Sequence, residues 1–317
     1  MTTPDFPFFL IGHDRSGTTM LRLILDRADA AVPPESMFLI DVDRTAPPAE
    51  VLREAWNHPR VRLWGLEGAP PPIPDGLDHD EALRFAFSAP FVAYAEQAGK
   101  TRWGDKTPAY IGHVDEIAAI WPDARFVVLV RDGRDVALSV MRVPFGANNV
   151  WAAARSWAHA IRLGREAAAR HPDRVITLRY EDLVRNPERH VVTLCTFLEL
   201  GYDPDMLAIE RSDRSKVVED QSSWFTEIWG GITTSAAGKW RREMTPRQQA
   251  VFESVAGTEL AELGYETGEQ ARPSTLAAAP AYAAHDATVR VANFVRLRLV
   301  QERGREVRHV LRRKLTR

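Results

Sequence analysis

The chain has 317 residues, of which 45% are hydrophobic, and its formal net charge at pH 7 is −2. Such a length can bury a substantial core, and the near-neutral charge offers no general basic field for nucleic acid. The single cysteine, Cys195, excludes an intramolecular disulfide and a thiolate zinc site, and its apolar neighbours indicate a core residue. The start lacks a basic segment and a long apolar run, so we expect no signal peptide and a soluble, cytoplasmic protein.

Patterns typical of strands and helices alternate along most of the chain. The apolar residues 6–12 end in a glycine and predict a buried strand, and Leu21, Ile24 and Leu25 fall at helical spacing after it. Further strands are predicted over residues 124–130 and 175–178, and further helices over residues 81–99, from about 135, over 151–170 and over 187–200. This alternation favours an α/β, P-loop-like fold of three layers, with a central parallel sheet flanked by helices.

The end of the chain has a different composition. Residues 1–270 are expected to form one domain, and residues 271–284, rich in alanine, proline and serine, are expected to be a linker. Residues 285–317 are rich in arginine, with apolar side chains at helical spacing, and predict a basic C-terminal helix. Such a helix could lie on an anionic membrane surface, contact an acidic acceptor, pack in a dimer or stay solvated on the domain.

The loop between the first strand and the first helix carries a phosphate-binding pattern. Gly12 and Gly17, followed by Thr18 and Thr19, have the spacing of a Walker A loop, but Thr18 replaces its lysine. Glycines let backbone amides approach an anion, and the N-terminus of the next helix attracts it. The charged residue is Arg15, whose guanidinium suits phosphate or sulfate oxygens without a metal. The loop therefore favours a short phosphate group over a magnesium-bound triphosphate.

The loop sequence PFFLIGHDRSGTTML, residues 7–21, resembles the 5′-phosphosulfate-binding loop of the sulfotransferase family. The resemblance is strongest to the branch with tyrosylprotein sulfotransferases and many bacterial sulfotransferases, and it covers roughly residues 6–245 by motif order. It implies 3′-phosphoadenosine-5′-phosphosulfate (PAPS) as a cosubstrate, with no metal. The donor-binding residues that it implies are Arg15, Ser16, Gly17, Thr18, Thr19, Arg131, Ser139, Tyr180 and Lys239.

Several of these assignments come from the segments after later strands. In the family, an arginine after a central strand and a serine eight residues later hold the 3′-phosphate. Arg131 and Ser139 match this pair in type and spacing, which implies the same role here. Tyr180 matches a tyrosine that contacts the nucleotide, and Lys239 a late lysine that returns to the donor phosphates. The alternatives are a surface Arg131 beside an Arg134–Asp135 ion pair, and a half-buried tyrosine in a strand-to-helix turn.

The resemblance also implies catalytic residues. Lys106, in the segment WGDKTP, would stabilise charge on the departing phosphate together with Arg15, and Glu35 would accept the proton of the acceptor hydroxyl. Outside this context, Lys106 would be an exposed turn lysine and Glu35 a solvated loop residue. His113 and His13 are competing general bases, and His113 is more typical of a helix surface.

Two other functions remain open from the sequence. A small-molecule kinase of the same fold would need a lysine where Thr18 stands, and a non-catalytic nucleotide-binding protein would not need Glu35 or Lys106. The acceptor is expected to be a hydroxyl of a carbohydrate, a lipid, a peptide or another small molecule. Further residues expected in a lid or acceptor pocket, or alternatively in the core, are Ser212, Ser215, Trp224, Phe225, Trp229 and Trp240.

Overall fold

The computed structural model describes residues 6–143, 146–212, 229–268 and 280–289. Its centre is a five-stranded sheet in the order β2-β3-β1-β4-β5, in which every pairing is parallel. The strands are β1 (Phe8–Gly12), β2 (Ala30–Ala31), β3 (Arg102–Lys106), β4 (Arg125–Val130) and β5 (Val175–Arg179). The parallel sheet predicted from the sequence is confirmed.

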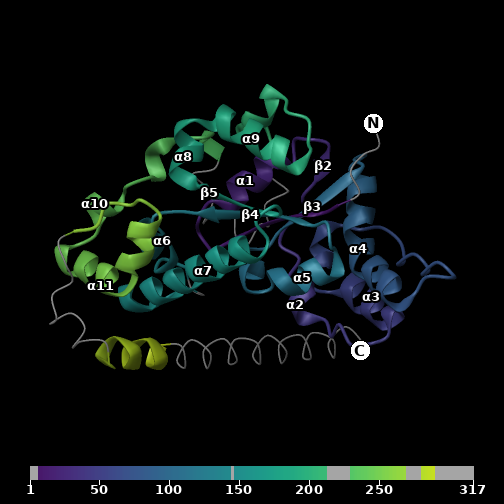
Figure 1. The fold of residues 1–317 in the computed structure, drawn as a ribbon, viewed down its shortest axis with the longest axis horizontal. Helices are drawn as coiled ribbons and strands as arrows, with labels where there is room; N and C mark the ends of the chain where they lie inside the picture. The colour runs from purple at the N-terminus through teal and green to yellow at the C-terminus, as the bar shows by residue number, and fades with distance from the viewer. Residues whose placement is uncertain (1–5, 144–145, 213–228, 269–279, 290–317) are drawn as a thin grey trace, which may run out of the picture.

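Alternate side chains of the central strands enter two different cores. Phe9 and Ile11 of β1 lie in one core with Val128, whereas Phe8 and Leu10 lie in the other. The first core is covered by α4 (His79–Gln97), α5 (Val114–Ile120), α6 (Gly133–Val140), α7 (Val150–Arg170) and α11 (Pro246–Glu262). The second is covered by α1 (Thr18–Leu25), α8 (Tyr180–Arg185) and α9 (Pro187–Leu198), so that the sheet lies between two helical layers (Figure 1).

The strand register brings the carboxyl ends of the strands to one edge. Leu10 pairs with Lys106, and Gly12 pairs with Leu129, one residue before the end of β4. Since the strands are parallel, the segments that follow β1, β3, β4 and β5 all leave from this edge, where ligands of open α/β sheets bind.

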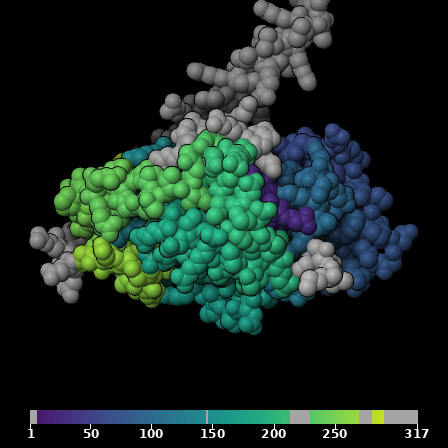
Figure 2. All heavy atoms as spheres, turned by 90° about the horizontal axis from the view of Figure 1, so that it is seen from above, coloured from purple at the N-terminus to yellow at the C-terminus, as the bar shows by residue number. Residues whose placement is uncertain are grey.

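Most predicted helices appear close to their expected bounds, and β3 was not predicted. Its sequence, RWGDK, places two charged residues at the end of a strand, whereas the other central strands are continuous apolar runs. The other short elements are α2 (Phe38–Asp41), α3 (Pro48–Asn57), η1 (Val61–Trp64), η2 (Pro108–Gly112), η3 (Pro204–Leu207), η4 (Ile209–Arg211), η8 (Thr234–Ala236) and α10 (Trp240–Glu243). Figure 2 shows the segment with α3 and α4 at one end of the molecule and that with α11 at the other.

A C-terminal helix covers residues 280–289 and begins inside the stretch expected to be a linker. It contacts the start of α7, where Asn149 Nδ2 donates to Tyr282 O at 3.0 Å and Asn148 Nδ2 to Asp286 Oδ1 at 3.0 Å. Residues 271–279 and 290–317, which hold most of the expected linker and basic helix, lie outside the described residues. Within the described part of the chain, no helix has both the length and the apolar character to cross a membrane.

Candidate functional site

The loop between β1 and α1 has the backbone of an anion-binding turn. Gly17 caps α1 at φ 97°, and Arg15 is also left-handed at φ 68°. A Cβ on Gly17 would lie 2.6 Å from Tyr180 Cδ2, so the loop packs against this ring only as glycine. Ser16 Oγ is buried without a hydrogen-bond partner among the described residues. The loop thus holds an unsatisfied hydroxyl beside the N-terminus of α1, as an anion site would.

Three further residues that were predicted to bind the sulfuryl donor, Arg131, Ser139 and Tyr180, meet at this loop. Arg15 Nε donates to Ser139 Oγ at 3.0 Å, although the two residues are 124 positions apart. Arg131 Nη1 donates to Arg15 O at 3.2 Å, and the guanidinium carbon of Arg131 lies 4.8 Å from the centre of the Tyr180 ring. The segments after β1, β4 and β5 therefore bring Arg15, Arg131, Ser139 and Tyr180 together.

The segment that contains Lys239 is fastened to the turn after β4. Asp135 accepts from Gly238 N at 2.6 Å and from Trp240 N at 2.8 Å, the residues on either side of Lys239. Arg131 Nη2 donates to Ala236 O at 2.6 Å. The turn that carries Arg131 thus also fixes the backbone around Lys239.

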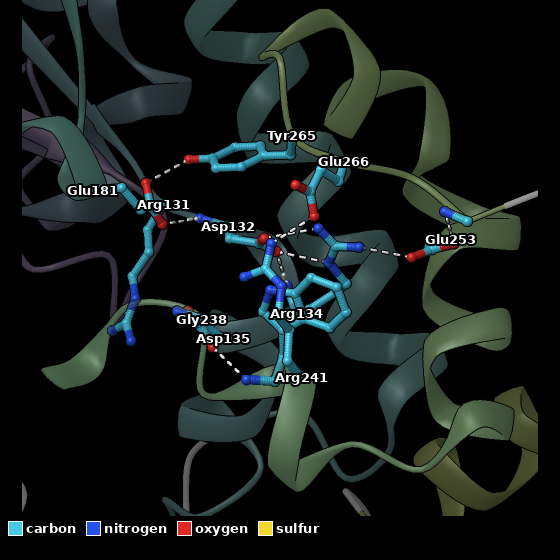
Figure 3. Close-up of polar contacts among 12 residues, drawn as sticks. Arg131, Asp132, Arg134, Asp135, Glu181, Gly238, Arg241, Glu253, Tyr265 and Glu266 are labelled. Carbon is cyan, nitrogen blue, oxygen red and sulfur yellow. Dashed lines mark hydrogen bonds and ion pairs between the residues drawn. The ribbon is translucent and has the colours of Figure 1, made fainter. Parts of the chain in front are cut away.

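The alternative of a surface Arg131 beside an Arg134–Asp135 ion pair is wrong. Arg131 is 9% exposed, and Arg134 is buried and pairs with other carboxylates. Arg134 Nη2 lies 2.8 Å from Asp132 Oδ2 and Nη1 lies 2.7 Å from Glu253 Oε1, as Figure 3 shows. Its guanidinium carbon also lies 3.5 Å from the centre of the Trp240 ring. Arg134 therefore links the turn after β4 to the late segments of the chain.

Lys106 and Glu35 form an ion pair at the end of β3. Lys106 Nζ donates to Glu35 Oε1 at 2.7 Å, and the lysine side chain is 5% exposed. Burial by itself raises the pKa of Glu35, but the charges of Lys106, Arg60 and Arg22 outweigh it, so the pKa is lowered overall. Neither residue is the solvated loop residue of the alternative interpretation. Glu35 is ionised at neutral pH and directly contacts Lys106.

With this geometry in place, comparison with known proteins identifies the family. The family model described as "Sulfotransferase family" matches residues 7–204. The chain belongs to the sulfotransferase family. The predicted family is thereby confirmed, and the fold and membership together assign sulfuryl transfer to the chain.

Relatives and solved structures support this membership. The chain is 26% identical to "Nodulation protein NoeE" of Sinorhizobium fredii over 288 residues. This match covers 83% of this chain and 66% of that protein. The chain is 25% identical to a "Putative protein-tyrosine sulfotransferase" of Caenorhabditis briggsae, over 82% of this chain and 89% of that one.

Two solved structures have the same fold. The sulfotransferase domain from the Synechococcus PCC 7002 olefin synthase matches with TM-score 0.62 at 21% identity, over 84% of this chain and 98% of that one. The domain from the curacin biosynthetic pathway matches with TM-score 0.57 at 19% identity, over 84% of this chain and 100% of that one. At these identities the likeness shows the fold.

The two competing histidines of the sulfotransferase lie in different places. His113 caps α5 and contacts Glu116, as expected for a polar residue on a helix surface. His13 lies in the loop after β1, with Nε2 3.0 Å from Ser156 Oγ, and burial lowers its pKa.

Sequence analysis missed several charged residues near Glu35. Arg60 lowers its pKa by charge, although nothing in the sequence places residue 60 beside residue 35. Asp14 has a raised pKa, chiefly through burial and then through the charge of Glu35. Asp105 is buried directly before Lys106, and its type and position in WGDKTP could have been noticed.

The residues expected to form a lid or acceptor pocket divide into two groups. Ser215, Trp224 and Phe225 lie outside the described residues. Trp240 is buried against Arg134, Trp229 packs against the second core, and Ser212 lies at the C-terminal end of η4. Among the described residues, no group of three or more His, Cys, Asp or Glu side chains could hold a metal ion.

Proposed function

We propose that the sulfotransferase takes its sulfuryl group from PAPS and transfers it to a hydroxyl acceptor. The observation that carries this proposal is the meeting of Arg15, Arg131 and Ser139 at the sheet edge. Two buried atoms there, Ser16 Oγ and Arg131 Nε, have no hydrogen-bond partner within the described chain. Buried polar atoms are normally satisfied, so both atoms fit an anionic ligand with oxygen acceptors.

The two parts of this arrangement suit the two phosphate groups of PAPS. The loop amides, Arg15 and the hydroxyls of Ser16, Thr18 and Thr19 would hold the 5′-phosphosulfate at the start of α1. Arg131 and Ser139 would hold the 3′-phosphate. Tyr180 would contact the nucleotide, and Lys239 would contact the donor phosphates. The absence of a lysine at position 18 argues against a kinase, because a P-loop kinase uses that lysine to hold its triphosphate.

The transfer itself needs one proton acceptor and charge stabilisation. The acceptor oxygen forms a bond to sulfur while the sulfur–oxygen bond to the 5′-phosphate breaks, and adenosine 3′,5′-bisphosphate leaves with the electron pair. Arg15 and Lys106 would stabilise the charge that develops on this phosphate. Glu35 would accept the hydroxyl proton. An ammonium group has three donors, so Lys106 can keep its bond to Glu35 and still reach the departing oxygen.

The acceptor is a hydroxyl of a peptide, a carbohydrate, a lipid or another small molecule. Some relatives are named protein-tyrosine sulfotransferases, which makes a tyrosine peptide the first acceptor to test. We also propose that residues 285–317, which are expected to form a basic helix, contact a membrane surface or a second copy of the chain, within a cytoplasmic setting.

Two measurements test the proposal. Adenosine 3′,5′-bisphosphate should raise the melting temperature, whereas ATP with Mg²⁺ should not, because a bound ligand stabilises only the form that binds it. Radiolabelled sulfate should then pass from PAPS to one member of a panel of a tyrosine peptide, N-acetylglucosamine, 4-nitrophenol and a long-chain alcohol. A melting-temperature response to ATP alone would favour a kinase instead, and donor binding without transfer a non-catalytic protein.

A further inference from the structure

A buried hydrogen-bonded cluster lies directly behind the pair formed by Glu35 and Lys106. Its members are Ser36, Asp105, Thr107 and Tyr110, and each of them is fully buried, with 0% of its surface exposed. Ser36 follows Glu35 in the chain, and Asp105 and Thr107 flank Lys106. The cluster therefore joins the segment that carries the proposed base to the strand end that carries the proposed cation.

When Asp105 is ionised, the hydrogen bonds of this cluster have one direction. Tyr110 OH accepts from Leu39 N at 3.2 Å and contacts Ser36 Oγ at 2.6 Å, so its proton goes to Ser36. Ser36 Oγ then donates to Asp105 Oδ2 at 2.5 Å. Thr107 Oγ1 accepts from Ser36 N at 3.1 Å and donates to Asp105 Oδ1 at 3.0 Å. Both chains of donors end on the Asp105 carboxyl, which accepts at both oxygens only when it is ionised.

We propose that Asp105 is a positioning residue for sulfuryl transfer, which holds Glu35 and Lys106 in their relative places through Ser36 and Thr107. This inference rests on the proposed function of Glu35 and Lys106. Asp105 accepts a hydrogen bond from the hydroxyl of Ser36, the residue that follows Glu35. Thr107 accepts a second hydrogen bond from the backbone amide of Ser36, so both bonds fix the backbone next to Glu35. A shift of the two segments would separate the base from the cation, and misplacement by about 1 Å can cost about 100-fold in rate.

The charge state of Asp105 links this positioning to pH. Burial raises its pKa to about 7, although the hydroxyls of Ser36 and Thr107 and the charge of Lys106 act in the opposite direction, and Glu35 adds to the increase. Tyr110 also faces the carboxyl, and its own pKa is raised well above the ordinary value, chiefly by burial. A protonated Asp105 must donate to the hydroxyl of Ser36 or of Thr107, which reverses one of the two hydrogen-bond chains that end on its carboxyl.

The replacement Asp105→Asn tests the positioning role. An asparagine puts an NH₂ donor where one hydroxyl now donates, so it imitates the protonated carboxyl in size and shape. We expect kcat for PAPS to fall about 100-fold, as for a misplaced reacting group. The affinity for adenosine 3′,5′-bisphosphate should stay unchanged, because the hydrogen bonds described above for the cluster do not involve the proposed donor-binding residues. The acidic limb of the kcat profile near pH 7 should also disappear.

Matched variants separate positioning from a loss of folding. Thr107→Val removes the hydroxyl and should lower kcat, whereas Thr107→Ser keeps it and should restore kcat. Glu259→Gln changes another buried carboxylate, which pairs with Arg162 away from the sheet edge, and should leave kcat and the pH profile unchanged. Wild-type kcat together with an unchanged limb in the Asp105→Asn variant would overturn the inference, as would equal rates for the two variants at Thr107.

A crystal structure of the Asp105→Asn variant makes the test independent of activity. We expect Lys106 Nζ and Glu35 Oε1 to move apart from their 2.7 Å contact. An unchanged contact would overturn the inference. Failure of the wild-type protein to transfer sulfate from PAPS would instead overturn the proposed function, and the separation of the two atoms would still be measurable.

Discussion

The side chain of Arg15 donates a hydrogen bond to Ser139, with Nε 3.0 Å from Oγ. Arg15 belongs to the loop after β1 and Ser139 to α6, after β4, so this bond joins the two proposed phosphate sites. A donor molecule bound at both sites would compete with Arg15 for the Ser139 hydroxyl, and both segments would then contact the same ligand. The bond therefore makes Ser139 a sensitive position for donor affinity.

The variant Ser139→Ala should bind adenosine 3′,5′-bisphosphate more weakly. Loss of a hydrogen bond to a charged group costs about 1.5 to 3 kcal/mol, or about 10- to 150-fold in the dissociation constant. Adenosine 5′-monophosphate, which lacks the 3′-phosphate, should lose much less. Isothermal titration calorimetry measures both ligands. Ser254→Ala, on α11 with its hydroxyl on Val251 O, is the control, and an equal loss for both ligands would contradict the assigned role.

The variant Lys106→Ala should lose turnover and keep donor binding. Removal of a group that stabilises transition-state charge costs about 100- to 1000-fold in kcat. It also removes the main opposition to burial at Glu35, so the pKa of Glu35 should rise from its lowered position. Steady-state rates with labelled PAPS measure the loss of turnover, and calorimetry with adenosine 3′,5′-bisphosphate measures donor binding. Turnover close to that of the wild type would exclude Lys106 from the transfer.

The pH dependence of stability should change in the Asp105→Asn variant. The pKa of Asp105 is about 7 in the folded protein against the ordinary 3.8, so the fold favours the protonated carboxyl. Its stabilising contribution is fully present below the ordinary pKa and is lost as the pH rises to about 7. Melting temperatures measured from pH 4 to pH 8 should fall more steeply in the wild type than in the variant. Parallel curves would show that Asp105 does not titrate in this window.

The variant Gly17→Ala should be less stable than Gly65→Ala. Both glycines have positive φ, at 97° and 71°, so both replacements carry backbone strain of about 1 to 2 kcal/mol. Only the Cβ at residue 17 would meet the Tyr180 ring, at 2.6 Å, whereas nothing lies within 4 Å of the Cβ at residue 65. Urea denaturation of the two variants isolates the packing effect. Equal losses in the free energy of unfolding would contradict tight packing of the loop on Tyr180.

A chain that ends at residue 270 should melt at a lower temperature than one that ends at residue 289. The longer chain keeps the hydrogen bonds from Asn148 to Asp286 and from Asn149 to Tyr282, at the start of α7. It also keeps Tyr282 packed against the first core. Differential scanning calorimetry measures the difference. Identical melting temperatures would show that residues 280–289 add nothing to the stability of the domain, and that residues 1–270 form the complete folding unit.

The order of the main elements could be predicted because their signals are local. Apolar runs predicted β1 and β4, and helical spacing predicted α1. The loop after β1 could be placed because its glycines and threonines are adjacent in the chain. The strand β3 could not, since its exposed-looking residues Asp105 and Lys106 are buried by partners far away in the sequence.

The site was only partly predictable for the same reason. The types and spacing of Arg131 and Ser139 pointed to their position, and the structure brings them to the loop. The contacts of Arg134 and Asp135 depend on Glu253 and on the backbone of residues 238–240, more than 100 positions later. No local pattern reports such pairings, so the sequence alone left a surface Arg134–Asp135 ion pair open as an alternative, although Arg134 is fully buried.

The contacts of Arg134 and Asp135 also affect the order in which the protein can mature during synthesis. A nascent chain that stops before Gly238 leaves the Asp135 carboxylate without its two amide donors and Arg134 without Trp240 and Glu253. Arg134 keeps only its pair with Asp132, and a buried carboxylate without donors is costly, so the turn after β4 is incompletely stabilised at this stage. The contacts of this turn are then among the last that the growing chain completes.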